Sequence, residues 1–160
     1  MMIRRFLTVI LLAGSLSAAA QTDSIVGTWA LTAADKLLPD GTRVQDYGSN
    51  PQGLAIFTAD GYCSIHVYRA ERLKFSSGDK FNGTPEEYKD ASLSMSVLFG
   101  RYSVDPVKST ITLHINRSSV PNLDNTTQVR PNELKGDTLS WKVPARKDGS
   151  IPITVLRRAK

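Results

Sequence analysis

The sequence predicts an all-β fold, an antiparallel up-and-down barrel of about eight strands with one short helical insertion. From Gly27 onward, runs of four to eight residues rich in Val, Ile, Thr, Tyr and Phe recur, which is the pattern of strands. Gly, Asp, Asn and Pro separate these runs, so successive strands are expected to be neighbours joined by short turns. A meander of this length closes readily into a barrel, which removes open sheet edges. A two-sheet sandwich is the alternative.

Nine segments carry the strand pattern. In chain order they are Val26–Thr32, Thr42–Tyr47, Gly53–Thr58, Tyr62–Arg69, Leu98–Val104, Thr110–Asn116, Thr126–Glu133, Thr138–Val143 and Ile151–Arg158. Two of the turns are explicit in the sequence, because Asp60-Gly61 and Gly136-Asp137 contain residue types that tolerate a positive φ.

One segment interrupts the strands and predicts a helix. Thr84 is a good N-cap, Pro85 suits the first helical position, and Glu87 stands three residues after the cap, as in a capping box. The helix is expected to run from Pro85 towards Met95. The polar loop before it carries Phe75 and Phe81. We expect this insertion to lie across one mouth of the barrel, either as a lid whose aromatic residues (Phe75, Phe81 and Tyr88) face a ligand or as a plug over the core.

Residues 1–20 have the pattern of a secretory signal peptide. Arg4 and Arg5 precede an apolar run from Phe6 to Leu12, and small residues end at Ala20. The run is shorter than the ~20 residues that span a bilayer, and no later stretch approaches that length. We therefore expect cleavage before Gln21, one β-barrel domain over residues 21–160, export to the periplasm or the medium, and no integral membrane segment after cleavage.

Charge and cysteine content exclude several classes of protein. Without Arg4 and Arg5, the mature chain has 18 basic and 15 acidic residues, a net charge of +3, and the basic residues are scattered. Nucleic-acid binding is therefore not expected. The single cysteine, Cys63, shares strand parity with Ile65 and Val67, which favours a buried, inert thiol and rules out an internal disulfide.

The sequence predicts neither a metal site nor a cofactor. The two histidines, His66 and His114, belong to different predicted strands and have no cysteine or second histidine at ligand spacing. No Gly-x-Ser-x-Gly motif indicates a serine nucleophile. Glu86 and Glu87 lie in the first turn of the predicted helix, where capping explains them.

Several short motifs, taken in order, resemble one family. They are Gly27-Thr28-Trp29, Asn50 to Leu54, Phe57 to Tyr62, Gly83 to Glu87, Phe99 to Asp105, Gln128-Val129-Arg130 and the final Arg158. The chain is similar to the bacterial and fungal lipocalin-like domains of the calycin group. The resemblance implies a closed antiparallel barrel in which Gly27 allows a tight bend and Trp29 plugs one end. It also implies that Arg158, from the last strand, lies over the Trp29 ring.

The resemblance implies little about activity, and we expect the barrel to hold a small hydrophobic or amphipathic ligand. The predicted ligand-binding residues are Phe57, Tyr68, Tyr102, His114 and Arg130. His114 is internal if its Thr-rich strand face lines a cavity, and exposed if the apolar face of that strand points inward. The strand face that carries Tyr68 is likewise either a cavity wall or an outer surface.

Three functions fit these residues. A carrier would hold a carboxylate head group with Arg130 and bury the tail. An isomerase, cyclase or lyase acting on a lipid-like substrate would use Tyr102 and His114 as weak candidates for acid/base catalysis. A barrel packed solid by Trp29, Trp141, Phe57 and leucines would act as a structural or interaction module. Binding makes the fewest chemical demands, so we expect a ligand-binding protein rather than an enzyme.

Overall fold

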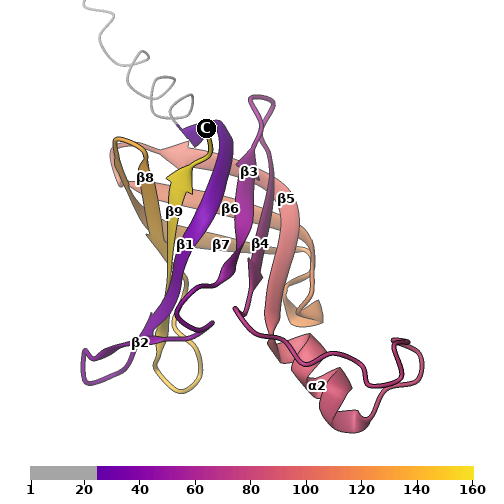
Figure 1. The fold of residues 1–160 in the computed structure, drawn as a ribbon. Helices are drawn as coiled ribbons and strands as arrows, with labels where there is room; N and C mark the ends of the chain where they lie inside the picture. Colours follow the sequence, from indigo (N-terminus) through magenta and orange to yellow (C-terminus); the bar gives the residue numbers. More distant parts are fainter. Residues whose placement is uncertain (1–24) are drawn as a thin grey trace, which may run out of the picture.

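The strands form one antiparallel sheet that closes into a barrel (Figure 1), and burial alternates along the strands because successive side chains point into and out of it. The computed structural model describes residues 25–160; the predicted signal segment, residues 1–20, and the predicted mature start, Gln21, lie outside the described residues. The strands are β1 (Gly27–Leu37), β2 (Arg43–Gln45), β3 (Gln52–Phe57), β4 (Tyr62–Tyr68), β5 (Met95–Asp105), β6 (Thr110–Ser118), β7 (Thr126–Lys135), β8 (Thr138–Lys142) and β9 (Ile151–Arg158).

The first and last strands close the barrel. From β3 to β9 each strand pairs with the next in sequence, and β9 returns to pair with β1 along Trp29 to Leu37. The other edge of β1 pairs with β3 near its start and with the short β2 near its end. The predicted nine segments and the closed barrel are confirmed, and the sandwich alternative is wrong because the single sheet closes on itself.

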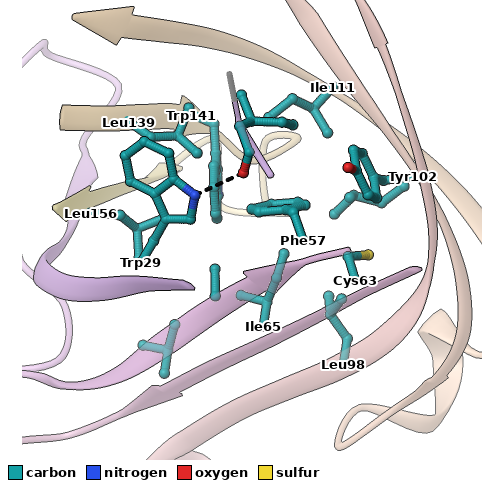
Figure 2. Close-up of a cluster of buried hydrophobic side chains, with 14 of the residues drawn as sticks. Trp29, Phe57, Cys63, Ile65, Leu98, Tyr102, Ile111, Leu139, Trp141 and Leu156 are labelled. Atoms are coloured by element: carbon teal, nitrogen blue, oxygen red, sulfur yellow. Dashed lines mark hydrogen bonds between the residues drawn. The ribbon is translucent and has the colours of Figure 1, made fainter. Parts of the chain in front are cut away.

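The core fills the half of the barrel that contains the start of β1. Trp29 is fully buried there, and its indole Nε1 donates a 2.8 Å hydrogen bond to the carbonyl of Ile25 (Figure 2). The Arg158 guanidinium lies 4.1 Å from the centroid of the Trp29 ring, and its Nη1 donates to the carbonyl of Val26. Gly27 has φ +128°, and a Cβ there would lie 3.3 Å from Arg158 Nη1. Arg158 of the last strand therefore lies over the Trp29 ring of the first strand, with which it is paired.

The helical insertion has the expected start and an unexpected position. α2 (Pro85–Leu93) begins with the complete capping box, in which the Thr84 side chain accepts from the Glu87 N–H and the Glu87 carboxylate accepts from the Thr84 N–H. The Ser76 N–H also donates to Glu87, and these backbone hydrogen bonds hold the pKa of this carboxyl below its usual range. α2 projects away from the barrel at the end opposite Trp29 (Figure 1).

The expectation of a lid or plug is therefore wrong. The Phe75 and Tyr88 rings pack against each other, 5.6 Å apart, and Phe81 is 82% exposed at a distance from the core. None of the three aromatic residues lines the barrel interior. The reason is local. Backbone N–H groups of the polar loop donate hydrogen bonds to the Glu87 and Tyr88 side chains of the helix, so the insertion packs on itself instead of on the barrel.

Candidate functional site

The half of the barrel opposite Trp29 contains a cavity of about 800 Å³. This volume lies in the range of small-molecule sites, which is roughly 300–1,000 Å³. The middle of its wall is apolar, with Ile65, Val67, Leu98, Leu123 and Val143. The helix end reaches the rim of the cavity through Ser92 and Leu93 and leaves the mouth open. The cavity is where a ligand fits, because the Trp29 half is filled by side chains.

Arg130 is the cationic group inside this cavity. Its side chain points inward from β7, it is 5% exposed, and its Cζ lies 5.8 Å from the centroid of the Trp141 ring. Arg130 Nε and Nη2 donate to one neutral acceptor, Gln128 Oε1, at 3.1 and 2.7 Å. Within residues 25–160, no carboxylate oxygen lies within 4.0 Å of its nitrogens. Burial lowers the pKa of Arg130 to about 10, so the group stays charged at neutral pH.

Two other arginines line the cavity, and both lie near its mouth with carboxylate partners. Arg69 Nη1 is 3.1 Å from Asp90 Oδ1. Arg146 makes a two-armed ion pair with Asp46, which Lys36 also contacts at 3.2 Å. Burial acts to raise the pKa of Asp46, but the hydrogen bonds and charge of Arg146, together with Lys36, outweigh it and hold this pKa below its usual range. Each of the two arginines near the mouth therefore has a carboxylate partner.

A cluster of aromatic rings lies in the packed core of the barrel. The Phe57 ring packs edge-on against Tyr102 at 4.9 Å and against Trp141 at 6.2 Å (Figure 2). Two buried donors near this level, Trp141 Nε1 and Asn132 Nδ2, have no hydrogen-bond partner among the described residues. They belong to residues that face each other across β7 and β8. Both residues line a smaller, separate hollow, and the Trp141 ring also lies beside Arg130.

Of the five predicted ligand-binding residues, Arg130 alone is among the cavity-lining residues of the described chain. Phe57 and Tyr102 do point inward, but they belong to the packed core, and the Tyr102 hydroxyl donates to the carbonyl of Thr58. The prediction that they line the cavity is therefore corrected, because the two rings pack against each other inside the core.

His114 and Tyr68 lie on the outer face, which corrects the expectation of an internal position. On β6 the buried residues are Ile111, Leu113 and Ile115, so strand alternation turns His114 outward, where Nδ1 lies 3.1 Å from Thr127 Oγ1. On β4 the buried residues are Cys63, Ile65 and Val67. Tyr68 is consequently on the opposite face. The trio of Tyr102, His114 and Arg130 considered for acid/base catalysis is not assembled.

Sequence reasoning missed most of the cavity. Gln128 shares the inner face of β7 with Arg130, and a two-residue spacing was the signal that could have identified it. Two ion pairs lie at the mouth of the cavity. The residues of Asp46–Arg146 are 100 positions apart and those of Arg69–Asp90 are 21 positions apart, so no local sequence pattern connects them.

Other chemistry has little support in residues 25–160. No group of three or more His, Cys, Asp or Glu side chains is placed to hold a metal ion. Cys63 is a buried free thiol, and burial raises its pKa to about 11 despite the nearby charge of Arg130. A short hydrogen bond joins Ser64 Oγ and His66 Nε2, at 2.7 Å, on the outer face of β4. No helix in this part of the chain is long and apolar enough to cross a membrane.

A family profile matches nearly all of the described chain. The profile of the lipocalin-like domain family matches residues 26–159. Among solved structures, the chain is similar to a lipocalin-like protein from Bacteroides uniformis, with 14% identity and a TM-score of 0.43 over 84% of this chain and 98% of that one. A redesigned β-barrel shows 17% identity and a TM-score of 0.43 over 89% and 96% of the two chains.

A protein from Bacteroides eggerthii shows 16% identity and a TM-score of 0.40 over 84% of this chain and 98% of its own. A search of curated proteins yields no significant match. Since the family profile covers the barrel from its first strand to its last, the chain belongs to the lipocalin-like domain family.

Proposed function

We propose that this protein binds one small hydrophobic or amphipathic molecule in the barrel cavity. The observation that carries the proposal is the cavity of about 800 Å³ with an open mouth and apolar middle walls. A solid barrel acting only as an interaction module would have that space filled by side chains, as the Trp29 half has. Burial of a ligand's apolar surface against these walls supplies the main driving force for binding.

The enzyme alternative has less support. Proton transfer needs an acid or base within hydrogen-bond reach of the substrate. His114 is outside the barrel, and the Tyr102 hydroxyl already donates to a backbone carbonyl in the core. Arg130 remains as a binding group, which suits a carrier better than a lyase or isomerase.

The test is titration with N-phenyl-1-naphthylamine, a neutral apolar dye whose fluorescence rises in a dry site. We expect saturable binding of one dye per barrel. Leu98→Trp, on the cavity wall, should reduce the affinity at least tenfold by filling the space. Phe99→Trp is the matched control, because residue 99 is adjacent in sequence but 50% exposed on the outer face. Absence of saturable binding, or equal loss in both variants, contradicts the proposal.

We further propose that the protein works after export, in the periplasm or the medium. The basic and then apolar pattern of residues 1–20 supports this proposal. Intact-mass measurement of the protein from its own host should give a chain that begins at Gln21. A mass that includes residues 1–20 would contradict export by this route.

A further inference from the structure

We propose that the ligand is a singly charged amphipathic anion, a long-chain carboxylate, bound with its carboxylate on Arg130 at the inner end of the cavity and its apolar tail towards the mouth. This inference rests on the proposed function and adds the chemical class and the orientation of the ligand. The three arginines that line the cavity differ in burial and in their carboxylate partners.

Burial and pairing distinguish Arg130 from the other two. The side chains of Arg69 and Arg146 are 39% and 40% exposed, and each has a carboxylate partner. Arg130 is 5% exposed and has no carboxylate within 4.0 Å in the described chain. A buried charge is unfavourable unless it is paired. Arg130 is thus the most deeply buried of the three arginines, and it is the one without a carboxylate partner in the described residues.

Hydrogen bonding at the inner end points to the same kind of ligand. A guanidinium has five N–H donors, and Arg130 Nε and Nη2 share the single acceptor Gln128 Oε1. The Trp141 ring lies beside the guanidinium, and its Nε1 is buried without a hydrogen-bond partner among the described residues. A carboxylate brings two acceptor oxygens and no donor, which complements this excess of donors.

The number of unpaired cations favours one negative charge. One guanidinium balances a carboxylate, whereas a phosphate monoester carries about −1.5 to −2 at neutral pH and would leave charge uncompensated. The mouth arginines do not supply the remainder, because Asp46 and Asp90 already hold them.

The positions of the apolar side chains along the cavity wall indicate how the ligand is oriented. Ile65, Val67 and Leu98 lie between Arg130 and the mouth, and Leu93 and Val120, 60% and 42% exposed, lie at the rim. A tail that runs outward from Arg130 contacts this surface along its length. In the reverse orientation, the head would compete with ion pairs at the mouth, and the tail would cover an unpaired cation.

The experiment compares palmitate with hexadecanol, each displacing the neutral dye from wild-type protein. We expect palmitate to bind at least tenfold more tightly than hexadecanol. Arg130→Gln, which removes the charge but retains a polar side chain, should abolish this preference and leave the alcohol's affinity within threefold of wild type. Arg101→Gln is the control for net charge, since Arg101 stacks on Tyr62 outside the barrel.

The outcomes separate the inference from the proposed function. If the dye binds but the acid and the alcohol bind equally, the inference is wrong and the proposed function stands. If the dye does not bind wild-type protein, the proposed function fails as well. If Arg146→Gln abolishes the preference and Arg130→Gln does not, the head group binds at the mouth and the orientation is wrong.

Orientation is tested directly by fluorescence quenching with palmitate brominated near the carboxylate or near the tail end. Trp141 lies beside Arg130, so its emission should be quenched more by bromine near the carboxylate. Trp141→Phe identifies the share of quenching that belongs to this residue rather than to Trp29. Stronger Trp141 quenching by the tail bromine would overturn the orientation.

Discussion

The two halves of the barrel each contain an arginine beside a tryptophan, and the two pairs differ in almost every other respect. At the closed end, Arg158 lies 4.1 Å over Trp29, donates to the backbone of Val26 and lies 3.8 Å from Asp137. In the cavity, Arg130 lies 5.8 Å from the Trp141 ring and contacts only the neutral Gln128 through hydrogen bonds. Arg158 remains partly accessible to water, whereas Arg130 is buried.

Because of this difference, we expect Arg158 to raise the free energy of unfolding and Arg130 to lower it. Arg158 joins the two ends of the sheet at little desolvation cost, because part of its side chain is still hydrated. Arg130 loses its hydration and gains no carboxylate, and this burial lowers its pKa. A protein keeps such a group when binding needs it, so stability and ligand affinity should respond oppositely to changes at the two arginines.

The largest effect is expected at Trp29. Trp29→Ala removes a fully buried ring and its hydrogen bond to Ile25, and it should lower the free energy of unfolding by about 3–5 kcal/mol. Urea unfolding followed by circular dichroism measures the change. Phe99→Ala, at an exposed aromatic residue, is the control and should cost less than about 1 kcal/mol. Equal losses would mean that the closed end is not the centre of stability.

Arg158→Met should have the next largest effect. It removes the cation from the Trp29 ring and the hydrogen bond to Val26, while the methionine preserves most of the apolar contact. We expect a loss of about 1–2 kcal/mol in the same urea measurement. A variant as stable as wild type would show that the pairing of β1 with β9 does not depend on this arginine.

Arg130→Met should change stability in the opposite direction. The lowering of its pKa to about 10 corresponds to a burial cost of about 3 kcal/mol, since each pKa unit is about 1.4 kcal/mol. The lost hydrogen bonds to Gln128 and the lost contact with Trp141 offset part of this gain. We expect the ligand-free variant to be more stable by about 1 kcal/mol. A loss of stability would mean that Arg130 is a structural cation like Arg158.

The smallest effect is expected at the mouth, from Asp46→Asn. Paired with Arg146 and Lys36, the Asp46 carboxylate should contribute about 0.5–1 kcal/mol at pH 7. Because its folded-state pKa is lowered, this contribution is present above the unfolded-state pKa of about 4 and is lost as the pH falls through the folded-state value. Wild type and variant should therefore begin to converge in unfolding experiments as the pH falls below about 4, and they should coincide once the pH is below the folded-state pKa of Asp46. A difference that persists in acid would contradict the ion-pair explanation.

Much of the fold could be predicted because its signals are local. The alternation of apolar residues and the Asp60-Gly61 turn lie within a few positions of each other, and the structure has the corresponding strands. The capping box of Thr84 and Glu87 is likewise confirmed because its members are three residues apart. Strand parity with Ile65 and Val67 likewise predicted the buried position of Cys63.

The candidate site was predicted less well because a barrel interior is assembled from residues far apart in the chain. For His114 the sequence left both faces open, and the packing of Ile111, Leu113 and Ile115 decided that it points outward. Phe57 and Tyr102 were predicted as cavity walls, but their contact with each other placed them in the core. The helix was predicted correctly, while its position beside the mouth depended on hydrogen bonds within its own loop.

The sequence by itself determined the antiparallel strands, their turns and the helix start, because strand periodicity and a few turn and cap residues specify local geometry. The closure of the barrel by Trp29 and Arg158 was implied by the resemblance to the family. Only the tertiary structure decided that one half of the barrel is packed and the other open. It also decided that Asp46 and Asp90 neutralise the mouth arginines and that Arg130 is buried without a carboxylate. Ion pairing and cavity volume depend on residues that folding brings together from distant parts of the chain, so no local sequence pattern predicts them.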